Sequence, residues 1–419
     1  MLPLIQHRKN CRACDCKNLD LIFSLKPSPI GDAYVTQDMI DVEQPSYPID
    51  LYMCANCGLA QLLDVINPEI LYGDYIYLTA SSSGLSDHFK SYAEEVVSRC
   101  KPDINSLVVD IGSNDGTLLS YFKKIGMRVL GVEPATHIAA QATEDGIESI
   151  DKYFTYEIAR QIVQDHGHAT LITANNVIAN VDDLGSWLRA VKLLLADDGV
   201  FIFESYYLAD LLKNKVFDFI YHEHVSAFSV KPIQTFMSSY ELELVAVEHV
   251  ATKGGSLRYF IQKINGRLHN DGTVKEYIKL ENKFGLYNKN TYYEFSKKIN
   301  KIKKETGEFL EKIKKDNKTV VGFGASITCT TLIYHFEIGK YLDFLVDDNT
   351  AKQGRYSPGI HLPVFEASVL LKKKPDYAVI LAWRFADEII KRNTNYLKNG
   401  GIFIIPCPEF KIIKWNETI

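Results

Sequence analysis

The sequence has no long hydrophobic run and no strong excess of charge. No segment reaches the roughly 18 consecutive apolar residues that a membrane-spanning helix needs. The 419 residues carry a formal net charge of -5, which gives no general attraction to the phosphate backbone of nucleic acids. These absences argue against a membrane protein and against a nucleic-acid-binding protein. They favour a protein that acts on small molecules.

The first residues, MLPLIQHRKNCRAC, lack the apolar stretch that a secretory signal requires. We therefore expect a cytoplasmic location, in which the eight cysteines stay reduced and form no disulfides. The chain is longer than a single hydrophobic core usually organises, so two or three domains are expected.

Two CxxC pairs stand in the N-terminal part, with Cys11 and Cys14 in CRAC and Cys54 and Cys57 in CANCG. Each pair places two thiolates on one tight turn, and two such turns together supply the tetrahedral four-sulfur shell that zinc favours. None of the histidines or carboxylates near the pairs points to an open coordination position. The zinc is therefore expected to be structural. Cys16 could compete as a ligand. Buried apolar cysteines or a redox pair are the alternatives, although a redox site would need only one pair.

A strand, glycine loop, helix and second strand are predicted by SLVVDIGSNDGTLLSYFKKIGMRVLGVEPA. The first strand ends at Asp110, Gly112 and Gly116 bracket the turn, and Glu133 follows the second strand. Units of this kind bind their ligand at the carboxyl ends of parallel strands. The loop is therefore a candidate cofactor site.

The charge of this loop decides between cofactors. Asp110 and Asp115 would repel the pyrophosphate of a dinucleotide, which prefers a neutral GxGxxG turn. S-adenosylmethionine carries an ammonium and a sulfonium instead, and Glu133 could accept hydrogen bonds from its ribose. NAD and an α/β fold without a cofactor remain alternatives. The predicted cofactor-binding residues are Asp110, Gly112, Asn114, Asp115, Gly116 and Glu133, together with Asn175 and Asn176 farther along.

Asn175 and Asn176 follow a buried strand, where the adenine or the methionine end of the cofactor would lie. With Asp182 nearby, these asparagines could instead serve only to cap the following helix.

A basic helical stretch follows at about residues 280–318. Its apolar residues recur three or four positions apart, which predicts one buried stripe on a bridging helix rather than a nucleic-acid-binding surface. The stripe includes Phe295, Ile299, Ile302, Phe309 and Ile313.

A second strand, glycine turn and helix are predicted by TVVGFGASITCTTLIYHF. This turn carries no carboxylate, so Ser326, Thr328 and the backbone amides of the helix N-terminus could bind a diphosphate, as in a nucleotide sugar. The competing interpretation is a NAD site with Asp347 or Asp348 on the ribose, although GFGASI lacks the last glycine of that fingerprint.

Residues 221–224, YHEH, combine two histidines with a glutamate and a tyrosine. An acid/base cluster, a metal site and a solvated polar loop are all compatible with this composition. The apolar neighbours, FDFI before and VSAFS after, favour a cluster set against a cleft over an exposed loop.

The order of these motifs resembles the zinc-containing sugar C-methyltransferases, which act on nucleotide-linked 4-keto deoxysugars. The resemblance extends over nearly the whole chain. It depends on the paired cysteines with CGLAQL, then DYIYLTASSSGLSDHF, DIGSNDGTLL, GVEPA, ANNVIANVDDL, IYHEHVSAFS, GGSLRYFI, VGFGAS, VDDNTAKQG and PGIHLPV.

The resemblance implies a zinc-binding domain at 1–75, a methyltransferase domain at 76–250 and a C-terminal α/β domain at 251–419 that helps to bind the sugar nucleotide. It also implies that Tyr221, His222, Glu223 and His224 are catalytic, with His224 as the base. Such a base is chemically reasonable, because C-methylation requires removal of a proton from a carbon next to a ketone and imidazole titrates near neutrality. Glu223 would orient His224 or bind a hydroxyl, and Tyr221 would donate to the enolate oxygen.

The resemblance places Tyr75 or Tyr77 in the substrate or cofactor pocket, whereas simple aromatic packing between domains is the alternative. Two departures concern the substrate. Asn180 stands where many relatives have a histidine, so either that histidine is dispensable or Asn180 only positions the sugar. GASITCTTLI lacks the lysine and asparagine that many relatives carry in this loop.

We therefore expect an α/β protein with a small zinc-binding domain, a Rossmann-like class I methyltransferase domain and a C-terminal Rossmann-like domain. The expected reaction is methylation of a 4-keto-6-deoxysugar linked to dTDP, GDP or CDP, at C3, by a monomer. The alternatives are an O- or N-methyltransferase of the same fold, a NAD-dependent oxidoreductase acting on a nucleotide sugar, and a nonenzymatic zinc-bearing binding module.

Overall fold

The computed structural model describes residues 4–72 and 84–415. The chain divides into two compact units, each assembled from separated stretches of sequence. Unit 1 comprises Met1–Asp20, Met53–Ala209 and Val225–Tyr287, and unit 2 comprises Leu21–Tyr52, Asp210–His224 and Asn288–Ile419.

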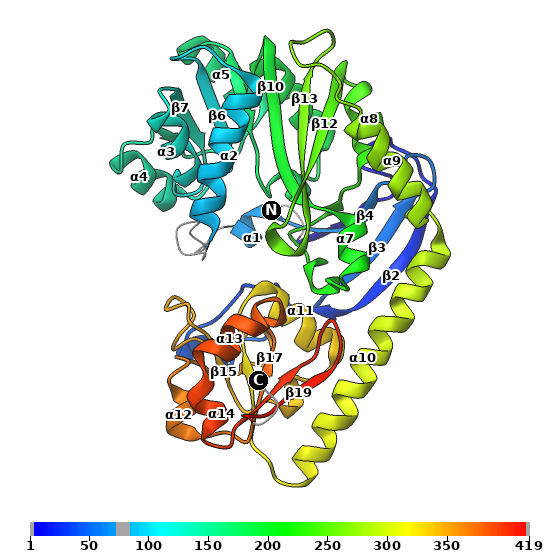
Figure 1. The fold of residues 1–419 in the computed structure, drawn as a ribbon, viewed down its shortest axis with the longest axis vertical. Helices are drawn as coiled ribbons and strands as arrows, with labels where there is room; N and C mark the ends of the chain where they lie inside the picture. Colours follow the sequence, from blue (N-terminus) through cyan, green and yellow to red (C-terminus); the bar gives the residue numbers. More distant parts are fainter. Residues whose placement is uncertain (1–3, 73–83, 416–419) are drawn as a thin grey trace. The chain divides into compact units, whose positions relative to one another are not determined.

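Unit 1 is built on a seven-stranded sheet in the order β12-β13-β10-β9-β6-β7-β8 (Figure 1). β13 runs antiparallel to both of its neighbours, and the other adjacent pairs are parallel. The connection direction reverses between β6 and β9, and open α/β sheets bind their ligands at such a point. The strands are β6 (Leu107–Ile111), β7 (Arg128–Val132), β8 (Ser149–Ile150), β9 (Ala169–Thr173), β10 (Leu195–Tyr206), β12 (Leu242–Val250) and β13 (Ser256–Lys263).

Helices cover the sheet because they turn apolar side chains toward it. A fully buried core joins Tyr92 of α2 (Leu85–Cys100) and Phe122 of α3 (Thr117–Lys124) to Val108 and Ile202 of the sheet. Elsewhere Trp187 of α6 (Leu184–Leu194) packs against Phe201, with ring centroids 5.7 Å apart. The expected α/β architecture with a parallel, Rossmann-like sheet is thereby confirmed for this unit.

The N-terminal part contributes short strands to unit 1. β1 (Ile5–His7) pairs with β5 (Asp64–Ile66), and β4 (Ala60–Leu62) pairs with β11 (Ser226–Ala227), both antiparallel. β4 and β11 are buried throughout, and Ile66 of β5 is 1% exposed.

Unit 2 is built on a second sheet, in the order β16-β15-β14-β17-β18-β19. Only the edge strand β19 is antiparallel to its neighbour. The chain again reverses direction across the sheet, here between β14 and β17. The strands are β14 (Val320–Phe323), β15 (Leu345–Val346), β16 (Val364–Phe365), β17 (Tyr377–Ile380), β18 (Ile402–Ile405) and β19 (Lys411–Ile413); β2 (Leu19–Ser28) and β3 (Tyr47–Cys54) lie mostly in this unit.

The expected basic helical stretch forms two helices, α9 (Thr273–Phe284) and α10 (Lys289–Lys315). α9 is capped by Gly285, whose φ of 74° is favourable for glycine, and the Asn288 side chain accepts a hydrogen bond from Asn290 N at the start of α10. The buried stripe of α10 was predicted correctly except at Phe309, which is half-buried; Leu310 is fully buried instead.

The remaining α-helices are short, with 5 to 11 residues each. None of the helices within residues 4–72 and 84–415 is both long and apolar enough to cross a membrane. They are α1 (Pro68–Tyr72), α4 (Thr136–Glu144), α5 (Tyr156–His166), α7 (Leu208–Lys213), α8 (Val230–Ser238), α11 (Ile327–Phe336), α12 (Val369–Lys373), α13 (Ala386–Arg392) and α14 (Thr394–Lys398).

Candidate active site

The four cysteines of the CxxC pairs converge in unit 1. Their sulfur atoms all lie within 4.8 Å of one another, with Cys11 Sγ 3.6 Å from Cys57 Sγ and Cys14 Sγ 3.5 Å from Cys54 Sγ. Four thiolates at about 2.3 Å from a tetrahedral zinc ion would lie about 3.8 Å apart, so the arrangement fits zinc. Cys16 is outside the cluster, with its sulfur 3.9 Å from the carbonyl oxygen of Asn18.

Arg12, inside the first CxxC turn, attaches this cluster to the rest of unit 1. Its buried guanidinium donates to the carbonyl oxygens of Leu62 and Val225 and pairs with Asp182 at 3.2 Å. Burial lowers the pKa of Arg12 to about 10, which leaves the side chain charged at neutral pH. A zinc ion that fixes the turn would therefore also fix Val225, the residue that directly follows His224.

The glycine loop after β6 has the conformation that its sequence predicts. Gly112 has φ 73°, and a Cβ atom on it would lie 2.3 Å from Val177 Cγ2, so only glycine fits. Asn114 and Gly116 also have positive φ, of 50° and 72°. Asp115 accepts hydrogen bonds from the backbone and hydroxyl of Thr117, at the start of α3.

Two buried carboxylates flank this loop. The Asp110 carboxylate accepts a 2.6 Å hydrogen bond from Thr173 Oγ1, and burial raises its pKa to about 7. The Glu133 carboxylate accepts hydrogen bonds from the backbone N–H groups of Asn114 and Ala135, at 3.0 and 2.9 Å, while burial raises its pKa. The loop thus concentrates acceptors and negative charge, which suits a cationic ligand with ribose hydroxyls.

Asn175 and Asn176 join the carboxyl ends of two strands instead of capping a helix. Asn175 Oδ1 accepts a hydrogen bond from Glu204 N at 2.9 Å, and Asn176 N donates to the Glu204 carbonyl oxygen at 2.8 Å. The N-cap of α6 is Asp183, whose side chain accepts from Ser186 N. The alternative that the asparagines only cap this helix is therefore wrong.

Buried polar atoms without a partner test whether a ligand would fit the loop region. Ser113 Oγ and Asn180 Oδ1 are buried and have no hydrogen-bond partner within the described part of the chain. Buried polar groups are rarely left unsatisfied, so a bound molecule with both donors and acceptors would complete them. S-adenosylmethionine has both kinds of group, and these residues fit it.

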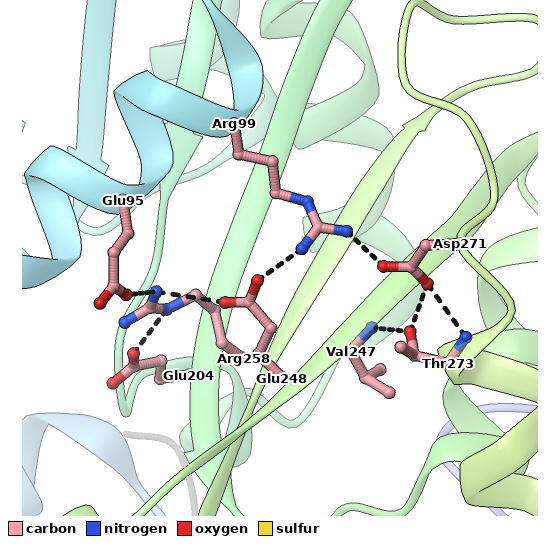
Figure 2. A network of polar contacts seen from close by, with 8 residues as sticks. All are labelled: Glu95, Arg99, Glu204, Val247, Glu248, Arg258, Asp271 and Thr273. Atoms are coloured by element: carbon pink, nitrogen blue, oxygen red, sulfur yellow. Dashed lines mark hydrogen bonds and ion pairs between the residues drawn. The ribbon is translucent and has the colours of Figure 1, made fainter.

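Glu204, whose backbone N–H donates to Asn175 Oδ1, belongs to an ionic network that sequence reasoning did not single out. Glu204 is buried, and its carboxylate accepts a hydrogen bond from Arg258 Nε at 2.8 Å. Its other oxygen lies 2.8 Å from His88 Nε2. The only sequence signal was a charged residue inside each of two apolar strands, FIFESYY and SLRYFIQ. The network in Figure 2 also includes Glu95, Arg99, Glu248 and Asp271.

Tyr221, His222, Glu223 and His224 lie in unit 2, and the last three are buried. His224 Nδ1 is 3.0 Å from the Phe219 carbonyl oxygen and His224 Nε2 is 2.9 Å from Tyr221 Oη. His222 Nε2 is 3.3 Å from the Tyr47 carbonyl oxygen, so His222 anchors the segment. The cysteine cluster is the one group of metal-ligand geometry found among the described residues, so the geometry gives no support to a metal at the histidines.

The second glycine loop, also in unit 2, leads into α11. Ser326 is the N-cap, accepting from Cys329 N at 3.4 Å, and Thr328 is buried with its hydroxyl 3.0 Å from Ser326 Oγ. Asp347, after β15, accepts hydrogen bonds from Ala325 N at 2.6 Å and Asn349 N at 2.7 Å. Tyr75 and Tyr77 lie outside the described residues.

Three family profiles match the chain in succession. They are a zinc binding domain at residues 11–72, a methyltransferase domain at 87–247 and a C-methyltransferase C-terminal domain at 251–408. Together with the sheet of unit 1 and the cysteine cluster, they define the class: the chain is an S-adenosylmethionine-dependent methyltransferase with a zinc-binding region.

A relative that aligns over its full length identifies the family of the chain. The chain is 32% identical over 420 residues to the C-methyltransferase NovU from Streptomyces niveus, and the alignment covers 100% of both sequences. The chain therefore belongs to this family of C-methyltransferases, and the expected S-adenosylmethionine-dependent C-methylation is confirmed at that level.

Solved structures resemble part of the chain. A methyltransferase from Clostridium acetobutylicum ATCC 824 is 14% identical with a TM-score of 0.34, covering 48% of this chain and 96% of that one. The magnesium protoporphyrin IX methyltransferase of Synechocystis PCC 6803, solved with SAH, has the same identity of 14% and TM-score of 0.34, covering 46% and 90%. Scores this low add no argument, so the assignment depends on the sequence matches.

Proposed function

We propose that the chain methylates C3 of a nucleotide-linked 4-keto-6-deoxysugar, with His224 as the base that removes the C3 proton. The substrate class follows from the family resemblance of the motifs. The observation that carries the role of His224 is its hydrogen bonding on both ring nitrogens. The Phe219 carbonyl oxygen can only accept, so Nδ1 carries the proton of the neutral imidazole and Nε2 carries the lone pair.

The residues around His224 fit the two charges that develop in the reaction. As Nε2 takes the C3 proton, the imidazolium gains a partner in the Tyr221 oxygen, which stands 2.9 Å away. The Tyr221 hydroxyl is then able to donate to the enolate oxygen, and Glu223 is a candidate partner for the imidazolium or for a sugar hydroxyl. Bound S-adenosylmethionine supplies an electrophilic methyl group.

The cofactor would be held by the glycine loop of unit 1. The residues proposed for this role are Asp110, Gly112, Asn114, Asp115, Gly116, Glu133, Asn175 and Asn176. Ser326 and Thr328, at the N-terminus of α11, are proposed to bind the diphosphate of the substrate, and Asn180 to position the sugar.

The test uses methyl-labelled S-adenosylmethionine and dTDP-, GDP- and CDP-linked 4-keto-6-deoxysugars in D₂O, with products identified by mass and NMR. A new methyl group on C3 in place of the C3 hydrogen is expected, and substrate that is recovered unmethylated should carry deuterium at C3. His224→Asn should reduce both by about 10²-fold to 10⁴-fold, the usual contribution of a general base.

The matched control is His361→Asn. His361 has φ 52°, a conformation that asparagine tolerates well, and its ring contacts Gln44 Oε1 at 3.2 Å. This variant should retain wild-type turnover. Retained turnover in His224→Asn would contradict the proposal, and so would a new methyl group on oxygen or nitrogen with the C3 hydrogen retained, which would indicate O- or N-methylation.

A further inference from the structure

The segment that carries His224 is attached to the second sheet by a buried ion pair. Asp218 Oδ2 accepts hydrogen bonds from Arg384 NH1 at 3.1 Å and from Trp383 Nε1 at 3.0 Å. The Asp218 side chain is 1% exposed and that of Arg384 16% exposed. Trp383 and Arg384 follow β17, so they stand at the carboxyl end of the sheet of unit 2.

Arg384 makes two further contacts in the same unit. Its guanidinium carbon lies 4.3 Å from the ring centroid of Phe219, a cation–π arrangement, and its NH2 lies 3.5 Å from Thr328 Oγ1. One side chain thus contacts the residue that precedes Phe219, Phe219 itself and the loop proposed to bind the diphosphate.

Phe219 is important because its carbonyl oxygen, 3.0 Å from His224 Nδ1, accepts a hydrogen bond from the protonated Nδ1. The Phe219 ring also lies 6.0 Å from the imidazole ring. A neutral imidazole has one proton to place, and a displaced carbonyl would allow it to move to Nε2. That tautomer has no lone pair on Nε2 and could not accept the substrate proton there.

We propose that Asp218 and Arg384 are positioning residues that hold the Phe219 carbonyl oxygen against His224 and thereby keep the imidazole in the Nδ1–H tautomer. The expected effect on catalysis rests on the proposed function. The expected effect on the tautomer of His224 does not. The competing role is direct binding, in which Asp218 Oδ1, a buried atom without a partner in the described part of the chain, accepts a substrate hydroxyl.

The first experiment reads the tautomer without substrate. Protein labelled with ¹⁵N-histidine is compared by long-range ¹H–¹⁵N NMR, with the His224 signals assigned from their loss in His224→Asn. The wild type should show a protonated Nδ1 and an unprotonated Nε2. Asp218→Asn and Arg384→Lys, which keep shape and charge respectively, should show a mixture of tautomers.

Arg392→Lys is the matched control. Arg392 lies on α13, eight positions along the chain from Arg384, and its half-exposed side chain pairs with Glu388 and Asp348 instead of with the His224 segment. It should keep the wild-type tautomer. S-adenosylmethionine affinity and the thermal transition are measured for every variant to verify folding. Wild-type His224 signals in both folded test variants would overturn the proposal.

The second experiment measures kinetics with the substrate that the sugar panel identifies. Asp218→Asn and Arg384→Lys should lower kcat and hydrogen exchange by about 10-fold to 100-fold, with S-adenosylmethionine affinity unchanged. A raised KM alone, with unchanged His224 signals, would overturn positioning and indicate direct binding. If the wild type methylates no sugar, the proposed function fails, and the NMR result still decides the role of the ion pair.

Discussion

The two glycine loops of the chain share the pattern VVxxG and differ in charge. VVDIGSNDG of unit 1 and VVGFGASIT of unit 2 each connect a strand to a helix, and each is fixed by an acid after the next strand. Glu133 accepts from Asn114 N in one and Asp347 accepts from Ala325 N in the other. Position by position, however, Asp110 of the first loop corresponds to Gly322 of the second.

The acid after the second strand can therefore stabilise the loop itself, whereas the other charged groups of each loop determine which ligand it favours. In unit 1 Asp110 and Asp115 add negative charge. In unit 2 the hydroxyls of Ser326 and Thr328 stand at a helix N-terminus, with Arg384 3.5 Å from Thr328 Oγ1. A cation is favoured at the first loop and an anion at the second.

The largest expected effect comes from filling the first loop. Gly112→Ala places a Cβ atom 2.3 Å from Val177 Cγ2 at a φ of 73°. Overpacking of this kind typically costs about 1–3 kcal/mol in addition to the backbone strain of about 1–2 kcal/mol. We expect S-adenosylmethionine affinity, measured by calorimetry, to fall by about 100-fold or more.

Gly146→Ala is the control, because it introduces backbone strain without a steric clash. Gly146 has φ 88°, but its added Cβ would meet only the flexible Lys123 Nζ at 3.7 Å. S-adenosylmethionine affinity should fall by no more than about threefold, because this variant has the backbone strain of Gly112→Ala but not its steric clash. An equal loss in both variants would show that the shape of the Gly112 turn is not what binds the cofactor.

A change in the second loop should weaken binding of the sugar nucleotide instead of the cofactor. In Gly324→Ala, with φ 123°, the new Cβ lies 2.8 Å from Cys329 Sγ and 2.9 Å from Ala382 N. We expect the KM for the sugar nucleotide to rise by about 10-fold or more, in line with an overpacking cost of about 1–3 kcal/mol. S-adenosylmethionine affinity should stay within about twofold of wild type.

Gly354→Ala is the control in unit 2, since its φ is 77° and no atom lies within 4 Å of the added Cβ. It should leave both ligands unaffected. A loss of cofactor affinity in Gly324→Ala would reverse the assignment of ligands to the two loops.

A smaller effect is expected from pH. Because burial raises the pKa of Asp110 to about 7, this carboxyl is partly protonated at neutral pH. A cationic ligand favours the ionised form, so S-adenosylmethionine should bind more tightly as pH rises from 6 to 8, by up to about tenfold. Titration calorimetry at several pH values checks this, and Asp110→Asn should remove the dependence.

The same pKa gives the free protein the opposite trend. A carboxyl whose pKa is raised by folding contributes stability that is fully present below its unfolded pKa of about 3.9 and is lost as pH rises through its folded pKa of about 7. The unfolding free energy should therefore decline over this interval, and less so in Asp110→Asn. A cofactor affinity that is flat with pH in the wild type would show that Asp110 does not face the cation.

The contrast between the loops also shows what sequence can predict. Local signals were sufficient for the two strand–glycine–helix units and the four cysteines, because spacing within a few residues determines them. They failed for Glu204 and Arg258, which are 54 positions apart and meet only because β10 pairs with β13. The same limit applies to Asp218 and Arg384, which no local pattern connects.

Helix boundaries and burial show a finer limit. The break between α9 and α10 depends on Gly285 and Asn288, which act as caps through local geometry. Phe309 and Leu310 are both apolar neighbours on α10, and periodicity alone did not decide which one is fully buried. Phe309 instead lies at the side of the stripe, with ring centroids 5.8 Å from Tyr377 and 5.4 Å from Phe410.

The smallest expected effects test the two acids that hold the loops. Glu133→Gln replaces one acceptor oxygen by an amide that faces a backbone N–H, and it should weaken S-adenosylmethionine binding by about fivefold, the equivalent of one hydrogen bond of about 1 kcal/mol. Asp347→Asn makes the same change in unit 2. It should leave cofactor affinity unaltered and lower the unfolding free energy by about 1–2 kcal/mol.

Asp347→Asn also decides between the two interpretations of the second loop. If Asp347 bound the ribose of a dinucleotide, NADH would bind to the wild type and not to the variant, as NADH fluorescence would report. Because GFGASI lacks the last glycine of the dinucleotide fingerprint, we expect no NADH binding to either protein. The acid would then serve its own loop in unit 2, and the ligand would be recognised by hydroxyls, backbone amides and a helix N-terminus.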